Sequence, residues 1–301
     1  MNKIKKIFLP IYDFCQRIEG KAFPSHHSKK LFKKMVGHKC NLKDPRSLNE
    51  KLMYYKLKLY WNNPLVNDCT DKYKVREFVS GCSLTNILNT TYGVWDDPNG
   101  IDWDKLPDKF VLKLNTGSGS NIICRDKATL DKTKAIKTMK KWLKQRYGYL
   151  TSEQGVYGKV DRKIIAEKFI EGNKSASPDD FKFFCSYGEV KLVFVACDRF
   201  EGNTKFDFYY PDWKWIDVKN SHPNNGPIPK PKNYEKMLEY ASTLSKKFPL
   251  VRIDFYNNDG EIIFGEITFS HMGCVHPFDP EQFDYLFGGL FPDVKDANKI
   301  L

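Results

Sequence analysis

Apolar and polar residues alternate along two adjoining segments of the chain, residues 251–256 and residues 261–269. Alternation with a period of two is typical of β-strands that bury one face, and the Asn, Asp and Gly of residues 258–260 are typical of a tight turn. The sequence therefore predicts a β-hairpin. A three-residue loop that ends in a glycine bulge would place Asn257 opposite Glu261 and so set the register of the two strands.

The predicted register gives the hairpin one polar face. On this face Arg252 lies opposite Glu266, and Thr268 follows on the same side. Asp254 lies one pair further along, opposite Phe264, which makes Asp254 and Glu266 diagonal neighbours at about 7–8 Å. Their carboxylates can then converge on one or two hard cations such as magnesium, whereas the alternative is a solvated face with an ordinary Arg–Glu pair. The apolar face would consist of Val251, Ile253, Phe255, Ile263, Gly265, Ile267 and Phe269.

A second segment combines a strand with a loop of small residues. Residues 110–114 predict a strand with Lys113 on the face opposite the apolar side chains. The loop 115–120, Asn-Thr-Gly-Ser-Gly-Ser, leads to another strand rather than to a helix, so it fits neither a P-loop nor a dinucleotide-binding turn. Its two glycines can still bring backbone N–H groups against phosphate oxygens, with Lys113 supplying a positive charge nearby. A common Gly-Ser hairpin loop is the alternative.

The remaining pattern predicts a mixture of helices and strands. Residues 1–21 carry apolar side chains at helical spacing among basic residues, and Pro10 is expected to divide this helix into two short pieces. A basic amphipathic N-terminus can lie on an anionic membrane surface or pack on its own domain, and both alternatives stay open. Further helices are predicted over residues 47–59, 71–79, 128–147 and 234–248. A strand with a turn is predicted over residues 85–95, and further strands over residues 164–170, 181–184 and 190–197.

Length and composition indicate a folded protein with more than one subdomain. The chain has 301 residues, of which 41% are hydrophobic and 15% aromatic, enough for a sizeable core and two or three subdomains. No stretch has the apolar length of a membrane span and the N-terminal segment lacks a signal-peptide pattern, so a cytoplasmic protein is expected. The eight cysteines are scattered without the spacing of a zinc site, which fits reduced thiols.

The net charge of +12 favours an anionic partner. Nucleotide, nucleic acid, anionic lipid and acidic polysaccharide all meet this condition, and solubility alone is the plainest explanation. The sequence contains no zinc finger, RNP-type aromatic motif or repeat, so no nucleic-acid partner is expected.

Five short motifs occur in order along the chain. They are Asp71-Lys72, Phe110-Val111-Leu112-Lys113 with Gly117-Ser118-Gly119, Glu167-Lys168-Phe169-Ile170, Arg252-Ile253-Asp254, and Gly265-Glu266-Ile267-Thr268. This ordered set resembles the ATP-grasp fold and, within it, the TupA-like ATP-grasp family found in capsule and teichuronopeptide gene clusters. The resemblance implies an α+β protein with a basic helical N-terminal region (residues 1–70), a lid and adenine-hinge subdomain (71–180), and an antiparallel-sheet core with the metal-binding hairpin (181–301).

The resemblance implies an ATP site with magnesium as a second cofactor. The phosphates would contact Lys72 and Lys113. The other ATP-binding residues would be Gly117, Ser118, Gly119 and Ser120 in a flap over the phosphates, Glu167 with the backbone of Lys168 and Ile170 at the adenine, and Asp180 near the ribose. Asp254 and Glu266 would hold magnesium together with Thr268, a weaker ligand than the Asn that many members of the superfamily have at this position.

By the same resemblance, Arg252 would face the developing negative charge of an acyl phosphate, and such charge neutralisation is most of what a phosphoryl-transfer enzyme must provide. Lys182 and Arg199 join Arg252 as catalytic candidates. Residues 270–276 depart from the family pattern, because relatives have a Pro and a Gly-Ser-Gly run there. His271 in this segment is either a general base or a packed histidine.

Three classes of function fit these observations. In a ligase, ATP would phosphorylate a carboxylate of a sugar or an amino acid, and an amine would attack the acyl phosphate to give a modified surface polysaccharide or its precursor. A glycosyltransferase that uses a nucleotide-sugar is the alternative, and Asp102-Trp103-Asp104 matches its metal-binding pattern, although Gly100 and Pro107 around it indicate a turn. A non-catalytic adaptor that keeps the fold is the third. Peripheral contact of the basic N-terminus with the inner face of the membrane is left open.

Overall fold

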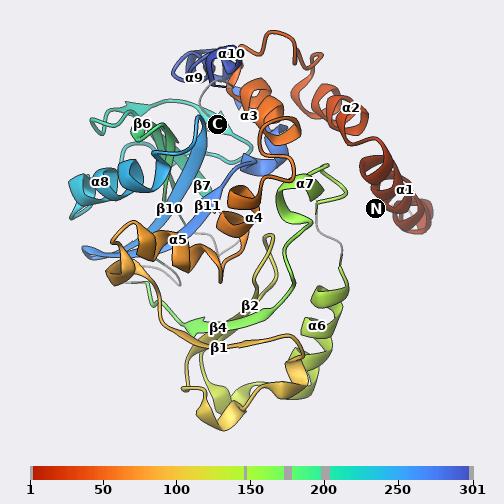
Figure 1. Cartoon of the computed structure of the whole chain (residues 1–301), viewed down its shortest axis with the longest axis vertical. Coiled ribbons are helices and arrows are strands. Elements are labelled where there is room, and N and C mark those ends of the chain that lie inside the picture. Colours follow the sequence, from red (N-terminus) through yellow and green to blue (C-terminus); the bar gives the residue numbers. More distant parts are fainter. Residues whose placement is uncertain (1–2, 146–147, 173–177, 198–203, 298–301) are drawn as a thin grey trace.

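The computed structural model describes residues 3–145, 148–172, 178–197 and 204–297 (Figure 1). Its helices are α1 (Lys3–Ala22), α2 (Pro24–Val36), α3 (Leu48–Leu57), α4 (Pro64–Thr70), α5 (Val75–Gly81), α6 (Lys132–Lys144), α7 (Gln154–Tyr157), α8 (Tyr234–Ser245), α9 (Gln282–Gly288) and α10 (Val294–Ala297), with 3-10 helices at Thr85–Ile87, Pro98–Gly100, Trp103–Lys105, Lys127–Thr129 and His271–Cys274. Its strands are β1 (Thr91–Trp95), β2 (Phe110–Leu114), β3 (Asn121–Cys124), β4 (Ile164–Lys168), β5 (Asp180–Ser186), β6 (Glu189–Cys197), β7 (Lys205–Tyr209), β8 (Trp215–Ile216), β9 (Lys219–Asn220), β10 (Val251–Asn258), β11 (Glu261–Thr268) and β12 (Phe278–Asp279). No helix in the described ranges is long and apolar enough to cross a membrane.

A large antiparallel sheet organises the C-terminal half. Within the described ranges it has six strands in the order β11-β10-β5-β6-β7-β8. Helix α8 packs across β5, β6 and β10, and the main hydrophobic core also takes in side chains of α3, α4 and α5. Because elements cover both faces of the central strands, β5 is buried at every position.

A smaller antiparallel sheet forms a separate unit, with the order β1-β4-β2-β3 in the described ranges. Helix α6 packs on β2, and a second core gathers side chains between residues 101 and 166. In Figure 1 this sheet and α6 lie at one end of the molecule and the large sheet lies at the other. Two antiparallel sheets with surrounding helices confirm the predicted α+β class.

The turn of the β10–β11 hairpin is shorter than predicted. Asn258 pairs with Glu261, so the loop consists of Asp259 and Gly260 alone. Their φ angles of 51° and 101° are the left-handed values of a type I′ turn, whose twist matches that of the strands. The predicted pairing of Asn257 with Glu261 was wrong, because Asp259 adopts a conformation that allows the two-residue loop.

A β-bulge in the same hairpin brings the two predicted metal ligands face to face. Phe255 pairs with Phe264, but the next pair is Asp254 with Glu266, so Gly265 is the extra residue on β11. Glycine suits this position, because a Cβ at Gly265 would lie only 3.0 Å from the backbone oxygen of Asp254. The predicted diagonal arrangement was therefore wrong, and the two carboxylates lie directly opposite each other.

The bulge also changes the buried face of β11. This face holds Ile262 and Phe264 in place of the predicted Ile263 and Gly265, because one extra residue reverses the alternation. Helix α1 likewise differs from the prediction, since it runs without a break at Pro10. A proline removes only one hydrogen bond from a helix, which a helix of 20 residues can tolerate.

Side-chain caps set several helix starts. Ser47 caps α3 as predicted, and Glu50 completes the capping box. Helix α6 starts later than predicted, because Asp131 caps its first turn, and α5 starts later because Asp71 bonds to two backbone N–H groups of the preceding turn. The strand with a turn predicted over residues 85–95 is confirmed, as a 3-10 turn followed by β1.

Candidate functional site

The polar faces of neighbouring strands line up across the large sheet. Glu266 on β11 lies opposite Asp254 on β10, and Asp254 lies opposite Lys182 on β5. Lys182 in turn lies opposite Phe194 on β6. Because directly opposed side chains point to the same side of a sheet, this row brings together two predicted metal ligands, a catalytic candidate and an aromatic ring.

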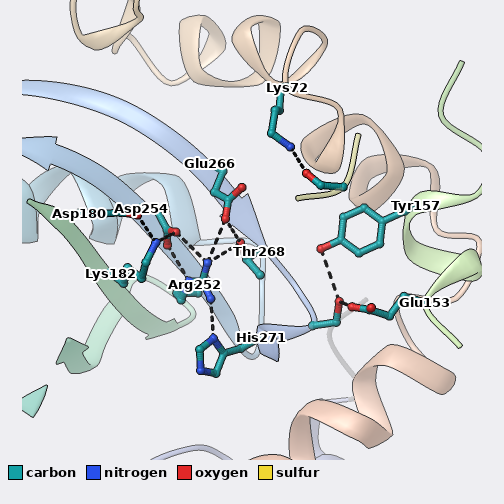
Figure 2. A network of polar contacts seen from close by, with 12 residues as sticks. Lys72, Glu153, Tyr157, Asp180, Lys182, Arg252, Asp254, Glu266, Thr268 and His271 are labelled. Atoms are coloured by element: carbon teal, nitrogen blue, oxygen red, sulfur yellow. Dashed lines mark hydrogen bonds and ion pairs between the residues drawn. The ribbon is translucent and has the colours of Figure 1, made fainter. Parts of the chain in front are cut away.

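Arg252 is the centre of the ion network on this row (Figure 2). Its side chain is 7% exposed, and its Nε and Nη2 atoms donate to the two carboxylate oxygens of Asp254 at 2.7 and 2.8 Å. Nη2 also donates to Glu266 and to the hydroxyl of Thr268, both at 3.0 Å. Burial lowers the pKa of the guanidinium, but the charges of Asp254 and Glu266 outweigh burial and raise the pKa, so Arg252 stays charged.

Lys182 supplies the second buried cation. Its ammonium group contacts Asp254 and lies 2.7 Å from a carboxylate oxygen of Asp180. Among the described side chains of this network, three carboxylates therefore face two cations, which leaves one net negative charge. The side chain of Glu266 is 37% exposed, so the excess charge lies at the end that an incoming cation can reach.

His271 forms a hydrogen bond with Arg252. Its Nδ1 atom accepts a hydrogen bond of 2.5 Å from Nη1 of Arg252, and its Nε2 atom lies 3.4 Å from the amide oxygen of Asn220. This arrangement fits the neutral tautomer with its proton on Nε2. Burial, and then the charge of Arg252, hold the pKa of His271 well below its usual value. His271 is thus packed against Arg252 and also lies on the wall of the larger cavity.

The free energy of unfolding is expected to fall as the pH drops below about 6.5. Below about pH 6.5 the histidine of the unfolded chain takes up a proton, whereas folded His271 stays neutral. The stability that His271 contributes is therefore fully present above the unfolded pKa of about 6.5, and it is lost toward lower pH at up to about 1.4 kcal/mol per pH unit. Burial lowers the pKa of His27 and His276 as well. The measurement is denaturant unfolding between about pH 7.5 and 5.5. The free energy of unfolding should fall less steeply with decreasing pH in His271→Gln than in wild type, whereas the control His26→Gln, at an exposed histidine, should follow wild type. Equal slopes for His271→Gln and wild type would contradict this.

Two adjoining cavities open on the network. The larger, of about 520 Å³, has Arg252, Lys182 and Thr268 on its wall. The smaller, of about 220 Å³, is lined by Asp254 and by residues 117–120. Both are lined by Lys72, Gly117, Ser118 and Glu266, so the cavities meet beneath this loop.

The β2–β3 loop occupies the place of the predicted flap. Gly117 and Gly119 both have a φ of 76°, a left-handed conformation that favours glycine. Nζ of Lys72 donates to the carbonyl oxygen of Gly117, and burial lowers the pKa of Lys72. Lys113 lies 2.6 Å from a carboxylate oxygen of Glu167. The flap and the row of carboxylates thus face one cavity from different sheets.

The residues predicted at the adenine lie beside this cavity. Glu167 and Ile170 line a small space together with Lys113. The side chain of Lys168 is exposed, and its backbone N–H and C=O are each hydrogen-bonded to residues 89–90 at 2.9 Å. Adenine binding by this segment stays a prediction.

Three other assignments also stay predictions. Asp180 lines the smaller cavity, but the contact that the structure shows is with Lys182. Thr268 donates to Glu266 at 3.0 Å, and its role as a metal ligand is a proposal. Arg199 lies outside the described residues.

The motif Asp102-Trp103-Asp104 forms a 3-10 turn. Asp102 accepts a hydrogen bond from the backbone N–H of Asp104 and pairs with Lys105 at 3.0 Å. The motif lines neither of the two cavities described above. The turn predicted here is confirmed, and no observation links it to a metal.

One wall of the larger cavity carries no sequence motif and was not predicted. Glu153, which directly precedes α7, is 4% exposed, and its carboxylate accepts hydrogen bonds from the hydroxyls of Ser270 and Thr151. The hydroxyl of Tyr157 lies 3.5 Å from that of Ser270. Glu153, Tyr157 and Ser270 line the same cavity as Arg252, and Figure 2 shows Glu153 and Tyr157 apart from the Arg252 network. The acceptor wall, as we call Glu153, Ser270 and Tyr157, therefore offers a buried carboxylate and hydroxyls.

The donor set of the hairpin fits magnesium. Magnesium in ATP sites is held by one or two carboxylates together with substrate phosphates, and Asp254 and Glu266 supply two carboxylates on opposed strands. Arg252 and Lys182 contact both oxygens of Asp254, so a metal ion at Asp254 would share this carboxylate with two buried cations. In the described ranges no group of three or more His, Cys, Asp or Glu side chains is arranged to hold a metal ion.

A carboxylate-bearing antiparallel sheet, faced by a glycine flap from a second, lysine-bearing sheet, defines a protein of the ATP-grasp fold. The chain belongs to the TupA-like ATP-grasp family, whose sequence profile matches residues 50–292. The predicted family and fold are confirmed.

Solved structures similar to this chain are ligases and a synthase. The D-alanine–D-alanine ligase from Bacillus anthracis complexed with ATP is 15% identical over 67% of this chain and 55% of that chain, with a TM-score of 0.38. The L-amino acid ligase from Bacillus licheniformis is 14% identical over 73% and 48%, with a TM-score of 0.42. The carboxyaminoimidazole ribonucleotide synthase from Aspergillus clavatus complexed with ATP is 13% identical over 67% and 45%, with a TM-score of 0.41. The chain thus spans about half the length of these structures. No curated protein sequence matches it.

Proposed function

We propose that this protein is an ATP- and magnesium-dependent ligase that joins a carboxylate to an amine through an acyl phosphate. The observation that carries the proposal is that Arg252, on the wall of the larger cavity, bonds to Asp254, which lines the smaller cavity, and to Glu266, which lines both beneath the glycine loop. The smaller cavity has the lysines, flap and carboxylates that suit ATP phosphates and magnesium. The larger cavity has room for an acceptor.

In the proposed reaction, a carboxylate oxygen of the substrate attacks the γ-phosphorus of ATP, and ADP leaves. An amine that binds as an ammonium ion first loses one proton. Its nitrogen then attacks the acyl carbon, the bond to phosphate breaks, and a second proton is lost from the nitrogen as phosphate departs. Arg252 and Lys182 would neutralise the charge that develops on the transferred group. Bound magnesium would supply further positive charge at the phosphates. The flap would exclude the water that hydrolyses an acyl phosphate.

The carboxylate would belong to a sugar or an amino acid, and the amine would approach from the acceptor wall. Membership of the TupA-like family supports a product that is a modified capsular or cell-surface polysaccharide, or its precursor. Such a reaction would take place in the cytoplasm, where ATP is available.

Trapping with hydroxylamine tests the proposal. Hydroxylamine converts an acyl phosphate to a hydroxamate, so the enzyme with MgATP and a panel of uronic acids and amino acids should yield ADP and hydroxamate together for at least one carboxylate. Neither product should form without ATP. Release of ADP with a phosphorylated acceptor and no hydroxamate would show direct phosphorylation and contradict a ligase.

The Glu153→Gln variant is expected to raise the KM for a cationic amine by about 10-fold or more. A hydrogen bond to a charged group contributes about 1.5–3 kcal/mol, and the variant keeps the shape of the side chain but loses its charge. Hydroxamate formation should be retained, since hydroxylamine is uncharged near neutral pH. Glu189→Gln, at the exposed start of β6, is the control. If Glu153→Gln slows both nucleophiles equally, Glu153 does not recognise the amine.

A further inference from the structure

Phe14 and Ile18 form an apolar stripe on the face of helix α1 that points away from helix α2. The helix bonds to α2 through Gln16 and Glu19, at 3.1 and 2.8 Å. With 100° between successive residues, Gln16 projects opposite to the stripe. Phe14 and Ile18 are accordingly 63% and 53% exposed. Figure 1 shows α1 at the edge of the molecule, beyond α2 and away from the large sheet.

Exposed apolar side chains concentrate on this pair of helices. Phe23, at the junction of α1 and α2, is 66% exposed, and Met35 on α2 is 42% exposed. Of the eight large hydrophobic side chains that are similarly exposed among the described residues, four lie between residues 14 and 35. Singly exposed apolar residues are ordinary, but Phe14 and Ile18 are neighbours one turn apart on the same face of α1, and an exposed contiguous apolar surface indicates an interaction site.

Positive charge concentrates on the same helices. Residues 3–39 contain ten Lys or Arg and two Asp or Glu, a net charge of +8 out of the +12 of the whole chain. Lys21, Lys29 and Lys33 are exposed on α1 and α2. An anionic partner would therefore meet its strongest attraction here.

We propose that the α1–α2 pair docks on an anionic lipid bilayer. A helix at a membrane interface places apolar side chains among the headgroups while Lys and Arg contact anionic lipids. A soluble polyanion would account for the lysines but not for exposed Phe14 and Ile18. A second copy of the chain would cover the apolar stripe but would bring two surfaces of the same charge together.

The docked helices would also hold the acceptor wall near the membrane. The carbonyl oxygen of Gly20 accepts a hydrogen bond of 2.6 Å from Gln154, and His27 lies 2.8 Å from the hydroxyl of Ser152. Ser152 and Gln154 flank Glu153 of the acceptor wall, so the surface that meets the bilayer and the wall of the cavity share one loop. Given the proposed ligase function, the acceptor would be a saccharide or polymer anchored in the membrane.

Co-sedimentation of the full chain with vesicles tests the docking. Binding should be at least tenfold tighter to vesicles of phosphatidylglycerol and phosphatidylcholine than to phosphatidylcholine alone, and it should weaken with salt. The double substitution Phe14→Glu with Ile18→Glu should weaken it at least tenfold. Leu286→Glu, which changes a 55% exposed residue on α9, is the matched control and should bind as wild type does. Unchanged thermal unfolding would show that both variants fold.

Three results would overturn the docking. The first is equal binding to both kinds of vesicle, or no binding to either kind. The second is a loss of vesicle binding in Leu286→Glu as large as that in the double substitution. The third is a dimer in sedimentation velocity that the double substitution dissociates, in a protein that binds no vesicles. A protein that binds no vesicles but binds dextran sulfate tightly, and equally tightly after substitution of Phe14 and Ile18, would show that the surface binds a soluble polyanion. Vesicle binding by a protein that forms no hydroxamate would refute the ligase proposal and leave the docking intact.

Discussion

An Arg252→Lys enzyme is expected to release ADP at least about 100-fold more slowly than wild type at saturating MgATP. The guanidinium of Arg252 bonds to Asp254, Glu266 and His271 at once, and an ammonium group cannot reproduce this fork. Loss of one donor that stabilises developing negative charge typically costs about 10²–10³ in kcat. Steady-state ADP release measures the effect.

The lysine variant is preferred to alanine for a structural reason. Removing one partner of a buried ion pair costs about 3–5 kcal/mol of stability, so Arg252→Ala would combine a chemical effect with partial unfolding. Thermal unfolding should confirm that Arg252→Lys is folded at the assay temperature. Arg46→Lys, in the exposed pair with Asp44, is the matched control and should retain wild-type turnover. A folded Arg252→Lys enzyme with wild-type turnover would refute the role assigned to Arg252.

The Glu266→Gln variant is expected to need at least about tenfold more magnesium for half-maximal ADP release. Its amide oxygen can keep the 3.0 Å bond to Arg252, and the site is partly exposed, so the fold should survive while the charge facing the metal is lost. A magnesium titration at fixed ATP measures the shift. Glu261→Gln, at the exposed start of the same strand, should behave as wild type. A normal magnesium requirement in Glu266→Gln would exclude Glu266 as a ligand.

Alternation along the hairpin predicted only part of each face. Arg252 and Asp254 on one strand, and Glu266 and Thr268 on the other, do lie together, because residues two apart on a pleated strand point to the same side. Beyond the bulge the prediction failed, since Ile262 and Phe264 are buried in place of Ile263 and Gly265. The register of the two strands could not be predicted in the same way. It depends on the left-handed Asp259 and on the bulge at Gly265, and hydrophobic alternation encodes neither.

The acceptor wall was beyond prediction for a different reason. Ser270 and Glu153 are 117 residues apart, and neither residue belongs to a periodic pattern or a motif. They meet because the loop after β11 packs on the segment before α7, a contact that depends on the whole fold. The ATP-binding residues were predicted from resemblance. Lys72, Lys113, Asp180 and residues 117–120 line the smaller cavity, and their contacts to ATP stay a prediction.

Thermal unfolding with and without nucleotides tests the ATP-dependent function most directly. A ligand at about 100 times its Kd adds about 2.7 kcal/mol of stability, so MgATP should raise the Tm of the wild type and have little effect on Asp254→Asn. A UDP-sugar with magnesium should leave both unchanged. Stabilisation by the UDP-sugar and not by MgATP would contradict an ATP site and would favour a glycosyltransferase.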